Sequence, residues 1–183
     1  REPFISAITG PGRASVFIYR DPRDQLVSHV FYAKDIHTGH GMHDYYNNVL
    51  KTMEERLNVA IEGCKLPGLG LPTVWERYEE HFGWFERDDV LCVKFEDFIL
   101  NRDETLGVLL DYIENFEVKF AASRPEAIEI LGKAIQPKES GTFRKGQPGN
   151  WQEYFTEENK ERFKVVAGDL LTRLGYEDSD SDW

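Results

Sequence analysis

The sequence contains only two cysteines, and it has no long apolar run. Cys64 and Cys92 lie in apolar contexts without CxxC spacing, which favours buried, reduced thiols over a disulfide. A membrane-spanning helix needs about 18 or more consecutive apolar residues, and no stretch approaches that length. The N-terminal "REPFIS" has no signal-peptide pattern. We therefore expect a cytoplasmic protein without a membrane partner.

The chain is also short of positive charge, with 22 basic residues against 33 acidic ones and a net charge of -11. This balance argues against nucleic acid as a partner. Hydrophobic residues make up 40% of the sequence, which is typical of a globular protein. We expect a single domain over residues 1–183, with residues 177–183 forming a frayed acidic tail. The chain does not begin with methionine, so we expect it to start inside a longer protein.

Alternating strand and helix patterns predict an α/β fold with a parallel sheet flanked by helices. Residues 14–20 ("ASVFIYR") and 88–97 ("DDVLCVKFED") are apolar runs between loop signals, as in buried strands. Residues 65–72 ("KLPGLGLP") should interrupt the helical pattern. Capping and periodicity predict helices over residues 21–35, 41–64, from 73 onward, about 104–115, 123–136 and 156–176.

A basic turn follows the first predicted strand. Arg20 stands at the strand's carboxyl end, where open α/β sheets bind their ligands. Ser28 lies about two helical turns beyond the predicted cap, Asp21. A forked cation and a hydroxyl suit a phosphate, although Asp21 would oppose an anion at the helix N-terminus. Alternatively, Arg20 pairs with Asp21 or Asp24, and Ser28 is solvated.

A second basic segment, "GTFRKGQPGNW" (residues 141–151), places Arg144 and Lys145 among glycines. Glycines such as Gly146 let backbone amides approach an oxyanion closely, and the two cations supply charge. This pattern predicts a second phosphate-binding element. A solvated basic loop before a helix is the alternative.

Together the two segments resemble a known family. "VFIYRDPRDQLVS" (residues 16–28, the RDP motif) and "TFRKGQPGNWQEYFTEENKERF" (residues 142–163, the RKG motif) resemble the nucleotide-binding signatures of PAPS-dependent sulfotransferases. PAPS is 3′-phosphoadenosine 5′-phosphosulfate, and PAP is the product left after sulfuryl transfer. The resemblance extends from Phe17 to about Tyr176 and implies a P-loop NTPase-like fold, apparently incomplete at its N-terminus.

The resemblance also assigns roles to individual residues. It implies that Arg20 and Ser28 grip the 3′-phosphate of PAPS, and that Arg144, Lys145 and Gly146 wrap the same phosphate. PAPS is the expected co-substrate, and no metal is expected. Phe95 stands where many family members carry a tyrosine next to the adenine. It could pack on the base or simply belong to the core.

The catalytic half of the family's site has no counterpart at the start of this chain. Family members carry a phosphate-binding loop with a lysine, and many carry a histidine base, upstream of the RDP strand. Residues 1–15 contain neither lysine nor histidine. The catalytic residues are therefore unknown, and we expect the 183-residue chain alone not to transfer sulfuryl groups.

The histidines suggest no clear base. His37, His40 and His43 are spaced by three in a glycine-containing loop. This loop could hold zinc, border an acceptor pocket or be a solvated connection, and the last two interpretations are favoured because no cysteine or acid has the usual spacing. His29 could face the crevice or the core, and His81 lies beside aromatics.

The resemblance implies a sulfotransferase that moves a sulfuryl group from PAPS to a hydroxyl or amine of a small-molecule or glycan acceptor. One alternative is a non-catalytic module that binds PAP or another nucleotide. Another is a P-loop kinase-like protein in which Arg144 and Lys145 close over ATP. A homo-oligomer is possible, because an incomplete parallel sheet leaves an apolar face and an edge uncovered.

Overall fold

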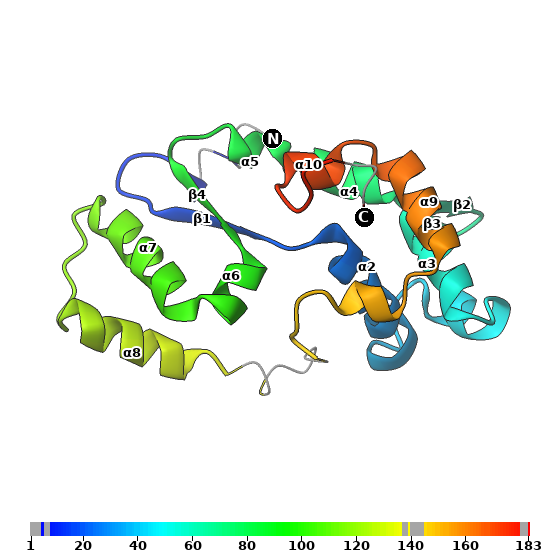
Figure 1. The fold of residues 1–183 in the computed structure, drawn as a ribbon, viewed down its shortest axis with the longest axis horizontal. Coiled ribbons are helices and arrows are strands. Elements are labelled where there is room, and N and C mark those ends of the chain that lie inside the picture. The colour runs from blue at the N-terminus through cyan, green and yellow to red at the C-terminus, as the bar shows by residue number, and fades with distance from the viewer. Residues whose placement is uncertain (1–4, 6–7, 137–138, 140–144, 180–182) are drawn as a thin grey trace. The chain divides into compact units, whose positions relative to one another are not determined.

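The computed structural model describes residue 5, residues 8–136, residue 139, residues 145–179 and residue 183 (Figure 1). Contacts divide the chain into two compact units. The first unit consists of Arg1–Arg20 and Phe82–Gly146, and the second consists of Asp21–His81 and Gln147–Trp183. A division of this kind can occur within one domain, so the single domain remains a prediction.

A two-stranded parallel sheet forms the centre of the first unit. Strands β1 (Ser15–Tyr19) and β4 (Val90–Lys94) lie side by side, in a register that pairs Ser15 with Val90 and Tyr19 with Lys94 (Figure 1). β1 is rich in β-branched and aromatic residues and β4 contains two valines, which suit a pleated surface. The structure thus confirms both expected strands, but not the burial of β1, whose Val16 and Ile18 are 38% and 53% exposed.

In the described part of the first unit, α5 (Phe82–Phe85) precedes β4, and α6 (Phe95–Leu100), α7 (Arg102–Glu114) and α8 (Arg124–Ala134) follow it. The expected capping box at Ser123 is present and opens α8. The Arg124 guanidinium donates to the carbonyl of Gly107 at 2.8 Å and pairs with Asp111, both on α7. Helices thus flank a parallel sheet, as the sequence predicts for an α/β protein.

The second unit is mostly helical. Its elements are α2 (Pro22–Phe31), the π-helical segments η1 (Tyr32–Ile36) and η2 (Tyr45–Val49), α3 (Met53–Glu62), the hairpin of β2 (Cys64–Leu66) and β3 (Leu69–Leu71), α4 (Val74–Glu79), the 3-10 helix η4 (Asn150–Glu153), α9 (Glu157–Ala167) and α10 (Leu170–Arg173). Its core contains Leu26, Val27, Val30, Leu57, Ile61 and Phe163, all nearly inaccessible to solvent.

The helix expected over residues 41–64 is interrupted. Leu50 is extended, with ψ of 130°, and α3 begins only after Thr52. The Thr52 side chain accepts the backbone N–H of Glu55, and the Glu55 carboxylate accepts the backbone N–H of Thr52. This capping box satisfies backbone N–H groups at the start of α3, and it therefore stabilises a new helix that begins after Thr52.

Glycine positions shape two further segments. Residues 65–72 interrupt the helical pattern, as expected, and form most of the β2–β3 hairpin. Gly63, with φ of 72°, makes this possible, because a Cβ there would lie 2.5 Å from the Leu71 carbonyl oxygen. The last predicted helix is likewise divided, since Gly168 adopts φ of 55° between α9 and α10.

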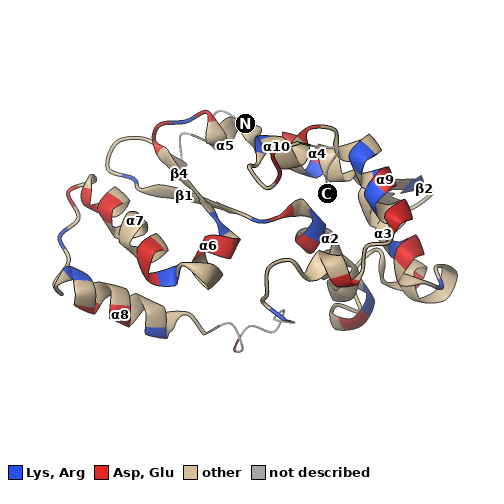
Figure 2. Cartoon of the chain, viewed as in Figure 1, with Lys and Arg blue, Asp and Glu red and all other residues tan. Residues whose placement is uncertain are grey.

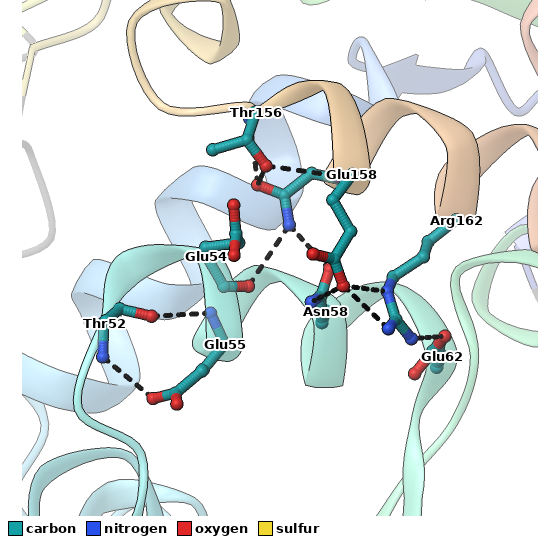
Figure 3. A network of polar contacts seen from close by, with 9 residues as sticks. Thr52, Glu54, Glu55, Asn58, Glu62, Thr156, Glu158 and Arg162 are labelled. Carbon is teal, nitrogen blue, oxygen red and sulfur yellow. Dashed lines mark hydrogen bonds and ion pairs between the residues drawn. The ribbon is translucent and has the colours of Figure 1, made fainter.

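Helix α9 is fastened to α3 by a polar network (Figure 3). Buried Asn159 donates to the Asn58 side chain at 2.7 Å and to the Glu54 carbonyl at 3.2 Å. Arg162 pairs with Glu158 on its own helix and with Glu62 on α3 (Figure 3). Figure 2 shows that α9 carries both signs of charge along its surface. The RKG motif therefore ends in a helix that these contacts hold against α3 within the second unit.

Among the described residues, none of the helices combines the length and apolarity needed to cross a membrane.

Candidate functional site

Two predicted site residues meet at one edge of the sheet. Arg20 follows β1 and Phe95 follows β4, and because the strands are parallel and in register, both lie at their carboxyl ends. The Arg20 guanidinium carbon lies 4.9 Å from the centre of the Phe95 ring. This is cation–π distance, so the ring helps to hold the guanidinium at the edge where α/β sheets bind ligands. Phe95 is half-buried.

An open pocket of about 390 Å³ lies beside this edge in the first unit. Tyr19, Cys92 and Lys94, which are close neighbours in the sheet, line it together with Asp97 and Asn101 of the following segment. Burial, reinforced by Cys92, Asp97 and Glu96, raises the pKa of Tyr19 to about 12. The phenol therefore remains a hydrogen-bond donor at neutral pH. The sequence patterns did not indicate this pocket.

The second arginine of the RDP motif is buried in the second unit. The Arg23 side chain is 3% exposed and forms ion pairs with Asp21 at 2.7 Å and Glu177 at 2.5 Å. Its guanidinium carbon lies 4.1 Å from the ring centre of Trp151 and 4.6 Å from that of Trp183. Burial alone lowers the pKa of Arg23, but Asp21 and then Glu177 outweigh it and raise that pKa above its ordinary value.

The contacts of Glu177 and Trp183 differ from the expected fraying of the acidic tail. Glu177 bonds to Arg23, and the Trp183 ring packs edge-on against Trp151 and Phe163, with centroids 5.4 Å apart in each case. The signal for this docking was a lone tryptophan in an otherwise acidic tail. Aromatic burial of this kind stabilises a packed end of a chain.

The second aspartate of the motif bonds to distant backbone. One Asp24 carboxylate oxygen accepts the N–H of Gly149 at 2.8 Å, and the other accepts the N–H of Trp151 at 2.8 Å. Gly149 has φ of 75°, a conformation that favours glycine, and it precedes the 3-10 turn η4. The charge on Asp24 is thus directed at two backbone donors in the RKG motif.

Asp21 was expected to oppose an anion at the helix N-terminus, and the structure shows which groups bind the carboxylates of Asp21 and Asp24. Asp21 caps α2 by accepting the backbone N–H of Arg23 at 2.9 Å, and it also accepts from the Arg23 guanidinium. Asp24 binds the backbone amides of Gly149 and Trp151. Neutralising partners therefore offset the repulsion that these carboxylates would exert on a nearby phosphate.

The other predicted residues lie in separate parts of the chain. Ser28 is half-buried on α2 in the second unit. Lys145 is exposed, and Gly146, with φ of 61°, ends the first unit. Arg144 lies outside the described residues. The structure therefore brings Arg20 and Phe95 together, while joint binding by Ser28, Arg144, Lys145 and Gly146 remains a prediction.

His29, expected to face either the crevice or the core, lies on α2 and packs inside the second unit. Its ring packs edge-on against His40 and Tyr46, at centroid distances of 5.3 and 6.0 Å. The His29 Nε2 atom and the Tyr46 hydroxyl are buried without a hydrogen-bond partner among the described residues. Burial, the Arg77 cation and His40 lower the pKa of His29 to about 3. The imidazole is therefore neutral at physiological pH.

The histidine-rich loop does not form a metal centre in the part of the chain that the structure describes. No group of three or more His, Cys, Asp or Glu side chains there is arranged to hold a metal ion. His40 instead accepts the Met42 backbone N–H at 3.1 Å, and His43 lies 3.0 Å from the Ala33 carbonyl.

The fold and the paired basic motifs define an α/β protein of the class that binds ligands at the carboxyl edge of its sheet. The sulfotransferase domain family matches residues 14–175, and the chain belongs to this family. The match includes both the RDP and the RKG motif. No curated protein matches the sequence.

Solved sulfotransferase structures have the same fold. A retinol dehydratase in complex with androsterone and the inactive cofactor PAP superposes with a TM-score of 0.61, at 18% identity, over 92% of this chain and 48% of that one. The mouse sulfotransferase SULT7A1 complexed with PAP has a TM-score of 0.58 at 15% identity, over 90% of this chain and 59% of that one. The present chain thus spans about half the length of these proteins.

The buried imidazole predicts a pH-dependent stability. Below an unfolded-state pKa of about 6.5, the unfolded chain binds a proton at His29 that the folded chain does not, so stability falls as the pH falls toward 3. Between pH 8 and pH 5 the loss from this group amounts to about 2 kcal/mol. Urea unfolding of the wild type at both pH values should show this loss in the free energy of unfolding. In His29→Phe, the loss between pH 8 and pH 5 should be smaller by about 2 kcal/mol.

His81→Phe is the matched control, because His81 is exposed and its removal leaves the buried imidazole in place. Equal losses between pH 8 and pH 5 in the wild type and in His29→Phe would contradict the assignment.

Proposed function

We propose that this chain is the 3′-phosphate-binding portion of a PAPS-dependent sulfotransferase. Arg20 and Ser28 of the RDP motif, with Arg144, Lys145 and Gly146 of the RKG motif, would hold the 3′-phosphate of PAPS. Phe95 would pack beside the adenine. The observation that carries the proposal is the meeting of Arg20 and Phe95 at the carboxyl ends of β1 and β4. A cation and an aromatic ring at such an edge match a ligand that combines phosphate and base.

The residues fit this ligand in their chemistry. Arginine forms forked hydrogen bonds to phosphate oxygens, and its charge persists at every physiological pH. Gly146 adopts φ of 61°, a backbone conformation in which amides can line an anion-binding concavity. The acids of the RDP motif are bonded to Arg23 and to backbone amides, which reduces their repulsion of the ligand. PAP in the structural relatives agrees with this choice of nucleotide.

The reaction proposed for the whole protein is sulfuryl transfer. A hydroxyl or amine of a small-molecule or glycan acceptor would attack the sulfur of PAPS, the bond from sulfur to the bridging phosphate oxygen would break, and PAP would leave while the acceptor loses a proton. Positioning of the two reactants and neutralisation of charge on the leaving phosphate would supply most of the rate, as in phosphoryl transfer.

The preference for PAP over AMP tests the proposed site. The two nucleotides differ in the 3′-phosphate, for which several cationic side chains are proposed. Isothermal titration calorimetry should therefore give a Kd for PAP at least tenfold lower than that for AMP. Equal affinities would reject the assignment, and a preference for ATP would favour the kinase-like alternative.

Single substitutions test the individual residues. A hydrogen bond to a charged group is worth roughly 1.5–3 kcal/mol, so Arg144→Ala should weaken PAP binding about 10- to 100-fold. Arg20→Ala should weaken it at least as much, and Arg20→Lys should recover only part of the loss, because an ammonium cannot reproduce the fork. Arg13→Ala, which removes an exposed arginine of the first unit, is the control. A folded Arg20→Ala or Arg144→Ala variant that binds PAP within twofold of the wild type would refute its role.

A non-catalytic PAP-binding module is the second candidate function. Within the chain itself, residues 1–15 contain neither a lysine to neutralise the 5′ side nor a histidine base. Losing one preorganised donor costs about 10²–10³ in rate, and losing a general base costs about 10²–10⁴. We therefore expect the 183-residue chain to bind PAP without turnover. A radiolabelled PAPS assay with a panel of acceptors measures this, and sulfated product from the pure chain would contradict it.

A further inference from the structure

A buried carboxylate joins the two motifs inside the second unit. Asp24 is 1% exposed, and its two oxygens accept the backbone N–H groups of Gly149 and Trp151. The donors lie 125 and 127 residues further along the chain. Burying a carboxylate costs free energy unless it is hydrogen-bonded. The hydrogen bonds from these two amides are therefore needed to keep Asp24 buried.

The two amides belong to a backbone arrangement that can bind anions. Gly149 is left-handed, with φ of 75°, and directly precedes the 3-10 turn η4. N–H groups that converge around a left-handed residue and the adjoining turn form a concavity suited to an anion. Here the anion is Asp24, at 2.8 Å from each nitrogen. The amides of Gly149 and Trp151 are thus occupied by a side chain of the protein.

Arg23 reinforces the same junction from the neighbouring position. Its guanidinium stacks on Trp151, the residue whose amide binds Asp24. Asp21 and Glu177 form ion pairs with it, and the centre of the Trp183 ring lies 4.6 Å from its guanidinium carbon. Consecutive residues of the RDP motif therefore hold both the backbone and the side chain of Trp151.

We propose that Asp24 is a positioning residue for the RKG motif, which it fastens to the first turn of α2. Gly149 lies three residues after Gly146, and three residues of chain span at most about 11 Å. Fixing Gly149 therefore restricts the places that Lys145 and Gly146 can reach. This inference rests on the proposed 3′-phosphate site, because it explains how the basic segment of that site is held without a direct contact between Asp24 and the nucleotide.

A positioning role and a purely stabilising role of Asp24 predict different effects on nucleotide binding when Asp24 is lost. If Asp24 positions the segment that binds the 3′-phosphate, its loss weakens the binding of PAP but not that of AMP. If Asp24 only stabilises the second unit, a folded variant keeps the preference of the wild type for PAP. The ratio of the two dissociation constants therefore separates positioning from stability.

Asp24→Asn is the first variant to examine. Asparagine keeps the shape of the side chain, but it is neutral and presents an NH₂ group to one of the two backbone donors. Calorimetry should show PAP binding weakened about tenfold, with AMP binding changed by less than twofold. Amide hydrogen exchange, followed by NMR, should become at least about tenfold faster at Gly149 and Trp151, while the interior amides of α9 keep their protection.

Asp35→Asn is the matched control, because it removes the same charge from an exposed acid of the same unit. A folded Asp24→Asn variant with the PAP-to-AMP ratio of the wild type would overturn the positioning role. If that variant does not fold, amide hydrogen exchange in the wild type is the test. The proposal requires the amides of Gly149 and Trp151 to be protected, and rapid exchange at both would contradict it. A wild type that binds PAP and AMP equally would instead reject the proposed function, while the exchange data still test the anchor.

Discussion

Two ionised side chains, buried next to each other at the start of α2, organise the second unit. Arg23 and Asp24 are 3% and 1% exposed, and burying a charge costs several kcal/mol unless the geometry of its partners is good. Their partners come from both ends of the unit: Asp21 on one side, and Gly149, Trp151 and Glu177 on the other. The start of α2 is therefore stable only when the C-terminal part of the unit is packed against it.

Under the proposed function, the same arrangement would let a chain with a net charge of -11 hold an anion. The carboxylates of Asp21 and Asp24 are bonded to the Arg23 guanidinium and to backbone amides, respectively. Arg20, in the first unit, lies against the ring of Phe95, with its guanidinium carbon 4.9 Å from the ring centre. This cation–π contact helps to fix the guanidinium at the carboxyl end of β1.

The second unit also contains groups that work against its stability. The His29 imidazole nitrogen and the Tyr46 hydroxyl are buried without hydrogen-bond partners in the described part of the chain, and each such group costs about 1–3 kcal/mol. The nearby Arg77 cation makes protonation of His29 still less favourable. The tight packing of α3 against α9, through Asn159 and Arg162, offsets part of this cost.

Interactions between close neighbours in the sequence could be predicted from the sequence, because the groups that decide them lie within a few residues. The strand before Arg20, the Asp21 cap and the boxes at Thr73 and Ser123 are of this kind. The box at Thr52 has the same pattern, but the apolar residues around it suggested one continuous helix. The RDP and RKG patterns also predicted the family, since these residue types recur at a fixed order and distance.

Only the tertiary structure determined which distant groups meet. Nothing near Asp24 in the sequence specifies that its carboxylate binds the amides of Gly149 and Trp151, more than a hundred residues away. The docking of Trp183 on Arg23 and the contact of Arg20 with Phe95 are equally non-local. The sequence by itself therefore determined strands β1 and β4, several helix starts and the candidate residues, but not the breaks at Leu50 and Gly168 or the β2–β3 hairpin. Packing decided the partners of the buried charges, because a buried charge requires a partner and the fold alone brings one within reach.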